Sequence, residues 1–171
     1  MTAPVPPAAK EHDSVPPRDM IVPLLALPDW TAANARAEAA GVRVRRALPW
    51  DLSQARHFVE RCFTRGWADE LACAWARVPI SAFLAVDGPQ IVGFAAYDCA
   101  HPGVFGPTGV RPDRRGRGVG AALLLRCLHD MRARGYIYAI IGAVGPAAFY
   151  EKVCGAMLLP EHWPSYVSGA Q

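Results

Sequence analysis

Val110-Arg-Pro-Asp-Arg-Arg-Gly-Arg-Gly-Val-Gly120 leads directly into an apolar run, Ala121 to Leu128, within a chain of 171 residues. Three glycines at alternate positions open a predicted helix without side chains that would screen its first backbone N–H groups. Those groups have no acceptor inside the helix, and the helix dipole places about half a positive charge there. The stretch therefore predicts a site for a phosphate group.

Two other kinds of phosphate site fit the sequence less well. Residues Gly116 to Ala121 match the loose dinucleotide pattern G-x-G-x-x-G/A, but no hydrophobic strand runs directly into the first glycine. The next strand candidate, Tyr136 to Ala143, carries no acidic residue for a ribose. A P-loop lysine followed by Ser or Thr is also missing. These observations disfavour NAD-type and ATP-type sites.

The stretch resembles motif A of the GNAT (Gcn5-related) N-acetyltransferase superfamily, which reads R/Q-x-x-G-x-G/A after a strand that ends in V-x-P. Arg115 to Gly120 supplies the glycine pattern, and Val110 to Pro112 supplies the strand end. A later segment, Gly145 to Ala156, is similar to the family's A-x-x-[FL]-Y-E-K-x-G-F segment. The resemblance covers roughly Val42 to Leu159.

The resemblance implies an α/β (α+β) fold with a mixed, mostly antiparallel central sheet of six to seven strands, flanked by helices. It also implies that the fourth and fifth strands splay apart, with the pantetheine arm of acetyl-CoA in the gap. The expected fourth strand begins at Val104 and contains Gly106-Pro-Thr-Gly109. Proline and glycine inside a strand predict a bulge or an end of pairing. The sequence thus weakens strand pairing where the family fold opens.

Composition and charge fit one soluble domain, with 52% hydrophobic residues, 19% charged residues and a formal net charge of +3. Five scattered cysteines without a C-x-x-C pair indicate reduced thiols in the cytoplasm and no metal site. Proline-rich residues 1–19 predict a disordered tail, and residues 20–171 a single acetyltransferase domain with 20–41 packed on its core as an N-terminal extension. No signal peptide, membrane contact or nucleic-acid partner is expected, and a homodimer is left open.

Hydrophobic periodicity and turn residues predict the other elements. Met20 to Leu27, interrupted by Pro23, predicts an edge strand or a packed extended arm. Three further helices are expected: Thr31–Ala40 with Thr31 as N-cap, one that begins after Asp51 as N-cap, and Trp67–Ala76. Strands are expected at residues 42–47, 81–86, 91–97 and 136–143. The helix after the glycine loop has an inward stripe, Ala121, Leu124, Leu128 and Met131, and polar faces with Arg126, His129, Asp130 and Arg132.

The resemblance assigns the acetyl-CoA contacts to two backbone segments. The pantetheine side falls on the fourth strand, at Thr108, Gly109 and Val110. The pyrophosphate falls on the loop and first helical turn: Arg115, Gly116, Arg117, Gly118, Val119, Gly120 and Ala121.

Tyr150 occupies the position of the tyrosine that, in the family, contacts the CoA sulfur and protonates the departing thiolate. The family's usual asparagine before this helix is replaced by Gly145-Pro146, which puts one cofactor contact in doubt.

Acceptor and base residues are less sharply indicated. By resemblance, the two helices that follow Asp51 form the wall over the acceptor pocket, which makes Trp67 and Glu70 substrate candidates. His57 is a weaker candidate, and Trp75 is expected in the core. Glu70 and Asp98 are the candidate general bases. Each of these side chains could instead have no functional role and simply pack in the core or lie on the solvated surface.

The implied function is that of an acetyl-CoA-dependent N-acetyltransferase, an acyltransferase of the EC 2.3.1 class. It would move an acetyl group to the primary amine of a small molecule by direct attack in a ternary complex. The alternative is a catalytically inactive acyl-CoA-binding or sensory domain. A nucleic-acid module built on Arg111 to Arg117 is disfavoured, because the chain has neither a basic helix face nor an aromatic stacking motif. The sequence does not identify the amine.

Overall fold

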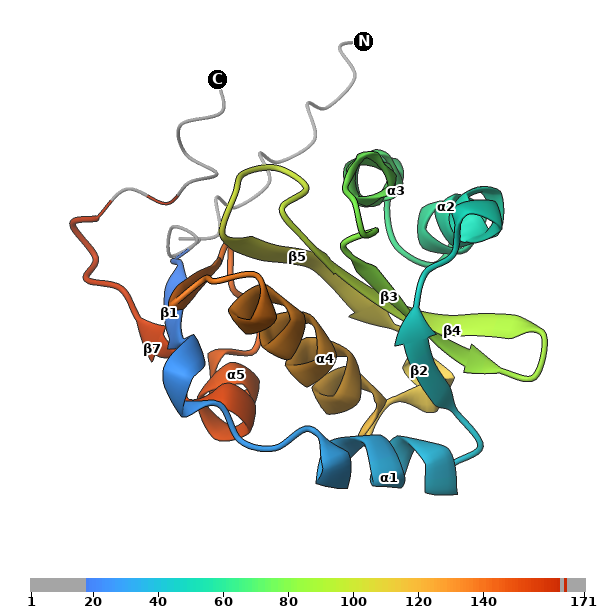
Figure 1. The fold of residues 1–171 in the computed structure, drawn as a ribbon, viewed down its shortest axis with the longest axis horizontal. Coiled ribbons are helices and arrows are strands. Elements are labelled where there is room, and N and C mark those ends of the chain that lie inside the picture. Colours follow the sequence, from blue (N-terminus) through green and yellow to red (C-terminus); the bar gives the residue numbers. More distant parts are fainter. Residues whose placement is uncertain (1–17, 164, 166–171) are drawn as a thin grey trace, which may run out of the picture.

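A seven-stranded sheet in the order β2-β3-β4-β5-β6-β1-β7 forms the centre of the computed structural model, which describes residues 18–163 and 165 (Figure 1). Neighbouring strands are antiparallel except β5 and β6, which run parallel. The predicted fold class is confirmed. The strands are β1 (Met20–Pro23), β2 (Arg43–Arg46), β3 (Ala82–Asp87), β4 (Gln90–Tyr97), β5 (Val104–Val110), β6 (Tyr138–Ile141) and β7 (Met157–Leu158).

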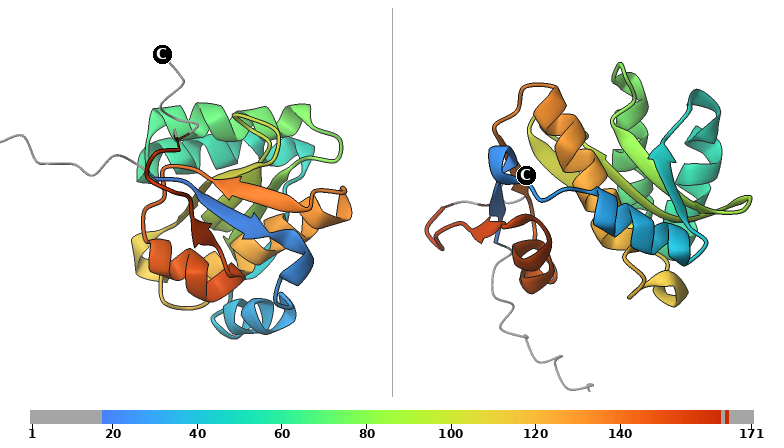
Figure 2. Two further views of the ribbon diagram at one scale, coloured as in Figure 1. Left: turned by 90° about the vertical axis from the view of Figure 1, so that its left-hand side faces the viewer. Right: turned by 60° about the horizontal axis from the view of Figure 1, so that its bottom comes forward.

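Helices cover both faces of the sheet (Figures 1 and 2). α4, with α1 and α5 beside it, packs on one face, and α2 and α3 pack on the other. The α-helices are α1 (Thr31–Ala39), α2 (Leu52–Cys62), α3 (Arg65–Ala72), α4 (Val119–Ala133) and α5 (Ala147–Cys154). Short 3-10 helices lie at η1 (Leu24–Ala26), η2 (Pro49–Asp51), η3 (Cys73–Ala76) and η4 (Pro112–Arg114).

The strands at the centre are buried on both sides. In β3, Phe83 and Ala85 belong to the hydrophobic cluster under α4, whereas Leu84 and Val86 belong to the cluster under α2 and α3. Successive side chains of a strand point to opposite faces, so a strand with helices on both sides reads as a continuous apolar run. Within the described residues, no helix combines the length and the apolar character needed to cross a membrane.

β1 corrects the sequence prediction of an edge strand or extended arm. It lies between β6 and β7 and is antiparallel to both. Pro23 is its last residue and pairs with Tyr138, whereas β7 reaches only as far as Ile21. On the β7 side, proline's missing N–H therefore removes no bond from the sheet. Most of the predicted tail lies outside the described residues, but Arg18 and Asp19, which the sequence places in it, are packed against the sheet.

Two helix caps also differ from the expectation. α1 begins at Thr31 as predicted, but the capping oxygen belongs to Asp29, which accepts hydrogen bonds from the Thr31 N–H at 3.0 Å and hydroxyl at 2.8 Å. Asp51 does not cap α2. Its carboxylate accepts the Leu48 N–H at 2.7 Å and pairs with Arg45 at 2.6 Å. At α1 the side chain two residues before Thr31 supplies the oxygen, and at α2 the Asp51 carboxylate is occupied by Leu48 and Arg45.

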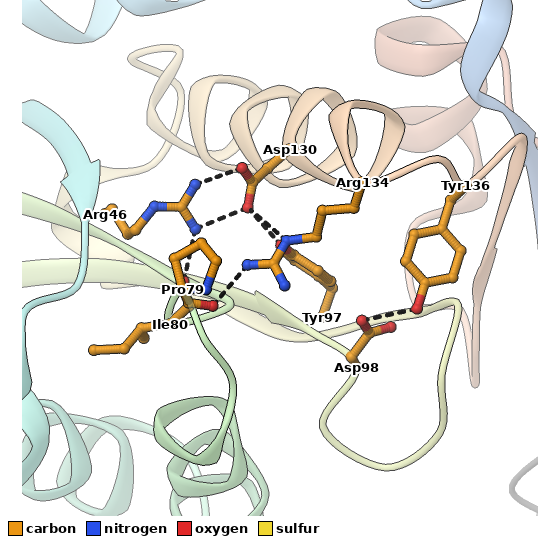
Figure 3. A network of polar contacts seen from close by, with 8 residues as sticks. All are labelled: Arg46, Pro79, Ile80, Tyr97, Asp98, Asp130, Arg134 and Tyr136. Atoms are coloured by element: carbon orange, nitrogen blue, oxygen red, sulfur yellow. Dashed lines mark hydrogen bonds and ion pairs between the residues drawn. The ribbon is translucent and has the colours of Figure 1, made fainter.

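A polar network fixes α4 to the sheet (Figure 3). The Asp130 carboxylate accepts hydrogen bonds from Arg46 of β2 and Tyr97 of β4, and Arg134 lies 3.7 Å away. The two arginines also donate to the carbonyl oxygens of Ile80 and Pro79. The sequence predicts Asp130 on a polar face, but this face turns toward the sheet and leaves the side chain 16% exposed.

The network keeps Asp130 ionised. Burial alone would raise the pKa of this carboxyl, but the hydrogen bonds from Arg46 and Tyr97 and the nearby positive charges outweigh it and hold the pKa below its ordinary value. Burial and the bond to Asp130 raise the pKa of the Tyr97 phenol. At neutral pH the network therefore contains one carboxylate, two guanidinium groups and one neutral phenol.

Removing the carboxylate should destabilise the protein strongly. Asp130→Ala leaves two partly buried guanidinium groups and a phenol without their shared acceptor, so we expect a loss of about 3 kcal/mol in the free energy of unfolding. The control is Asp69→Ala, which breaks the exposed ion pair with Arg56 and should lose less than about 1 kcal/mol. Urea unfolding of both variants measures the difference, and equal losses would contradict a structural role for the network.

Candidate active site

β5 and β6 separate soon after they meet. They pair only through Val104 with Ile140 and Phe105 with Ile141. The ladder between β5 and β4 continues but shifts register between Ala95 and Tyr97, opposite residues 106–107. From residue 106 onward, β5 has a strand partner on the β4 side only. The predicted opening between these two strands is confirmed.

A pocket of about 530 Å³ lies in this opening. One wall comes from β5, another from the loop between β6 and α5, and α3 and the β4–β5 loop complete it. Four candidates from the sequence meet here: Trp67, Glu70, Thr108 and Tyr150. The full lining consists of Trp67, Glu70, Ala100, His101, residues 105–108, residues 141–146 and Tyr150.

Aromatic rings form the α3 side of the pocket. α3 begins two residues earlier than predicted, with the Thr64 hydroxyl accepting the Trp67 N–H at 3.1 Å. The Trp67 indole stacks on Phe63 with ring centroids 5.8 Å apart and remains 40% exposed. Phe63 in turn packs so closely over β5 that a Cβ on Gly109 would lie 2.6 Å from its ring. Gly109 therefore allows the ring stack to approach the strand.

Glu70 is the acidic side chain in the pocket lining. It lies one turn after Trp67 on α3, and burial raises the pKa of its carboxyl. A carboxylate in such a position accepts a proton more readily than an exposed one. His101 also lines the pocket. No pattern in the sequence points to His101, because a single histidine in a loop has no diagnostic spacing to another functional residue.

Asp98, the other candidate base, lies outside the pocket lining. Its carboxylate oxygens accept the Gly103 N–H at 2.7 Å and the Tyr136 hydroxyl at 3.0 Å (Figure 3). The residue is buried and has a positive φ of 56°, which aspartate tolerates better than most residues. These contacts make Asp98 a residue that shapes the β4–β5 loop, and its position outside the pocket lining leaves Glu70 as the better placed of the two candidate bases.

Tyr150 enters the pocket from α5. The residue is 8% exposed, and its ring makes an edge contact with Phe149 at 5.1 Å. Burial, with a smaller contribution from Cys154, raises the pKa of its phenol. The hydroxyl is therefore protonated at neutral pH and is able to act as a proton donor.

The glycine loop lies at the N-terminus of α4, outside the pocket lining. Gly118 has a φ of 82°, and a Cβ at this position would lie 2.9 Å from the Cβ of Arg36, because α1 packs against the loop. Gly118 also provides the carbonyl oxygen for the N–H of Ala122 at 2.9 Å. The N–H groups of residues 119–121 precede this bond and have no acceptor within the helix. These amides are the ones that the sequence pattern predicts to hold a phosphate group.

Gly120 faces the gap. A Cβ built on it would point toward Val110 of β5 at 3.7 Å and Phe149 of α5 at 3.6 Å. The first turn of α4 therefore adjoins the elements that carry the pocket. The N-terminal turn of α4 and the pocket both adjoin β5 and α5.

The arginines of the loop differ in what they contact. Arg111 and Arg114 form ion pairs with aspartates at 2.7 and 2.5 Å. The Nε of Arg115 donates to the Val110 carbonyl oxygen at 3.0 Å, and Arg117 is exposed. Arg115 and Arg117, the two that the sequence analysis assigned to the cofactor, are also the two for which no ion pair is found among the described residues.

The weaker acceptor candidates lie elsewhere. His57 is exposed on α2 and does not line the pocket. Trp75 packs against the cluster under α2 and α3, and its indole N–H donates to the Leu48 carbonyl oxygen at 3.0 Å. In residues 18–163 and 165, no three or more His, Cys, Asp and Glu side chains are grouped in a way that could hold a metal ion.

Comparison with known structures gives the same architecture. A glucosamine N-acetyltransferase region of a fungal multi-domain β-N-acetylglucosaminidase matches with a TM-score of 0.68 at 16% identity, over 87% of this chain and 20% of that chain. A GCN5-related N-acetyltransferase from Sphaerobacter thermophilus matches with a TM-score of 0.66 at 23% identity, over 83% of this chain and 48% of that chain. A GNAT acetyltransferase from Brucella melitensis, in complex with acetyl-CoA, matches with a TM-score of 0.54 at 20% identity, over 72% of this chain and 90% of that chain.

These identities support a shared fold, and the chain spans only about a fifth and a half of the first two proteins. No curated protein matches the sequence. The family model for the acetyltransferase (GNAT) family matches residues 46–156, which include α3, the glycine loop and Tyr150. The chain belongs to the GNAT family of acetyltransferases.

Proposed function

We propose that the protein transfers the acetyl group of acetyl-CoA to the primary amine of a small molecule, by direct attack in a ternary complex. The observation that carries the proposal is the pocket in the β5–β6 opening, which gathers a buried tyrosine and a half-buried carboxylate from different elements. An acyl transfer to an amine needs an acid and a base of this kind.

The described residues fit acetyl-CoA along the gap. The open amides of residues 119–121 suit its pyrophosphate, since they combine unpaired N–H donors with the positive end of the helix dipole. The unpaired side of β5, residues 106–110, is available to the amides of the pantetheine arm. The acetyl end would then reach the pocket near Thr108 and Tyr150.

In the proposed reaction, the amine nitrogen attacks the thioester carbonyl, so that a C–N bond forms and the C–S bond breaks. Glu70 takes the proton that the amine loses, directly or through one water molecule. Tyr150 gives its proton to the departing CoA thiolate. A backbone N–H of β5 near residues 108–110 stabilises the negative charge that develops on the carbonyl oxygen.

The lining favours a cationic amine. It contains the Glu70 carboxylate and the partly exposed face of Trp67, and no Lys or Arg. A carboxylate beside an indole face attracts an ammonium group by charge and by cation–π interaction. A volume of about 530 Å³ suits a small molecule.

Acetyl-CoA binding tests the proposal first. A ligand at about 100 times its dissociation constant adds roughly 2.7 kcal/mol to a folded protein, enough to raise the unfolding midpoint by several degrees. We expect such a shift with acetyl-CoA but not with NAD or ATP. Binding without CoA release across a broad panel of amines would support the inactive acyl-CoA-binding alternative, which the Gly145-Pro146 replacement of the family asparagine keeps open.

Gly120→Val should abolish this shift. Its side chain would project into the space between Val110 and Phe149 that the cofactor must pass, while the protein stays folded. Gly120→Ala is the matched control, because a single Cβ makes ordinary contacts there and should reduce the shift only partly. Thermal unfolding of both variants with and without acetyl-CoA measures this. Full binding by the valine variant would refute the proposal that acetyl-CoA binds at the first turn of α4.

Tyr150→Phe should lower kcat by about 10²-fold or more and leave acetyl-CoA affinity nearly unchanged, because the proton donor is lost while the ring keeps its packing. The matched control is Tyr138→Phe, an exposed tyrosine of β6 outside the pocket lining. Steady-state release of CoA thiol measures both. An unchanged kcat in the Tyr150 variant would remove this residue from the mechanism.

The pH dependence of kcat/KM should show the titration of the Glu70 carboxyl group. A base works when it is deprotonated, so the rate falls as pH drops through its pKa, which burial raises above the ordinary carboxyl value. The acid limb should therefore lie at higher pH than an exposed glutamate would give. Glu70→Gln should lower kcat/KM and remove the limb. A limb that persists in the glutamine variant would assign it to another group.

A further inference from the structure

Asp19 is a buried acid just before β1, with 5% of its surface exposed. One carboxylate oxygen accepts hydrogen bonds from the Ala143 N–H at 3.0 Å and from the Ser165 hydroxyl at 2.7 Å. Its backbone oxygen accepts the Leu159 N–H at 2.9 Å. A buried carboxylate is tolerated only where such donors compensate for lost hydration. Asp19 thus joins the start of β1 to three later segments of the chain.

Ala143 has an unusual backbone. Its φ is 46°, in the left-handed region that residues with a Cβ rarely occupy. The N–H of Ala143 is held by Asp19, and the next N–H, of Val144, donates to the Arg18 carbonyl oxygen at 3.0 Å. Two successive amides are therefore anchored to residues 18–19. A disfavoured conformation persists only where the surroundings hold it in this way.

The anchored loop is a wall of the pocket. Residues 142–146 all line it, facing residues 105–108 of β5, and the loop runs directly into α5 with Tyr150. The position of the loop therefore sets the width of the opening and the place where α5 begins. Residues 18–19 lie outside the segment that matches the family model, residues 46–156.

We propose that Asp19 is a positioning residue for the active site: through the Ala143 N–H it holds the β6–α5 loop in the conformation that receives the acetyl end of acetyl-CoA. The inference rests on the proposed function for the identity of the ligand. Without Asp19, the loop exchanges among conformations, and ligand affinity falls by the fraction of time that the competent one is occupied.

Asp19→Ala tests the proposal through two measurements. Hydrogen–deuterium exchange without ligand should become faster in peptides that cover residues 142–147, while β3 and β4 keep their protection. Calorimetric titration should give acetyl-CoA binding about tenfold weaker, as expected for one lost hydrogen bond to a charged group. Adenosine 3′,5′-bisphosphate, which carries only the nucleotide end of CoA, should bind unchanged because the open amides of α4 lie outside the loop.

Two matched variants separate the loop contact from general stability. Asp19→Asn keeps an oxygen that accepts from Ala143 and Ser165, so loop exchange and acetyl-CoA affinity should stay near wild type. Arg18→Ala removes the guanidinium bond to the Leu159 carbonyl oxygen but keeps the Arg18 backbone oxygen that holds Val144. It should leave the exchange of residues 142–147 unchanged.

The outcomes are distinguishable. Unchanged loop exchange in Asp19→Ala, equal loss of both ligands, or an asparagine variant as impaired as the alanine variant would each overturn the proposal. If wild-type protein does not bind acetyl-CoA, the proposed function fails, and the exchange measurement alone decides the role of Asp19. If Asp19→Ala does not fold, Asp19→Ala combined with Ala143→Gly carries the test against Ala143→Gly alone, because glycine relieves the left-handed strain.

Discussion

Proline at position 107 cannot donate a hydrogen bond to a neighbouring strand, and the pairing of β5 with β6 stops at Phe105, two residues before it. The rest of the site depends on this interruption. Because β5 stays paired with β4, the sheet remains whole on one side while a pocket opens on the other. Side chains from α3 and α5 then reach a space that a continuous sheet would have filled.

The environments of Asp130 and of Glu70 in the pocket shift the pKa values of these two carboxyl groups in opposite directions. Around Asp130 on α4, each charge has a partner, and the pKa of the carboxyl is lowered. In the pocket, Glu70 gains no such partner that outweighs burial, and its pKa is raised. The first environment locks α4, whose N-terminus carries the open amides, in a fixed position. The second leaves the Glu70 carboxylate with a raised pKa, which suits the general base of the proposed reaction.

Local signals were sufficient for much of this. The glycine loop, the strands expected at 81–86 and 91–97 and the interruption in β5 follow from residues close together in sequence, where turn chemistry and periodicity dominate, and the place of Tyr150 follows from the resemblance of residues 145–156 to a family segment. What the sequence could not give depends on distant partners. Asp130 looks like a solvated helix residue until β2 and β4 are placed beside it, and Asp19 looks like part of a tail until Ala143 of the β6–α5 loop and Ser165 are placed beside it.

The place of β1 between β6 and β7 constrains the order in which the sheet is completed. β1 precedes the other strands of this sheet in the chain, yet its partners are residues 138–141 and 157–158. The strands β2 to β5 pair in the order in which they follow one another along the chain, so their pairing is able to form while synthesis continues. β1 must wait for both of its partners. The pocket wall that residues 18–19 anchor, just before β1, is therefore completed only when the later part of the chain has been synthesised.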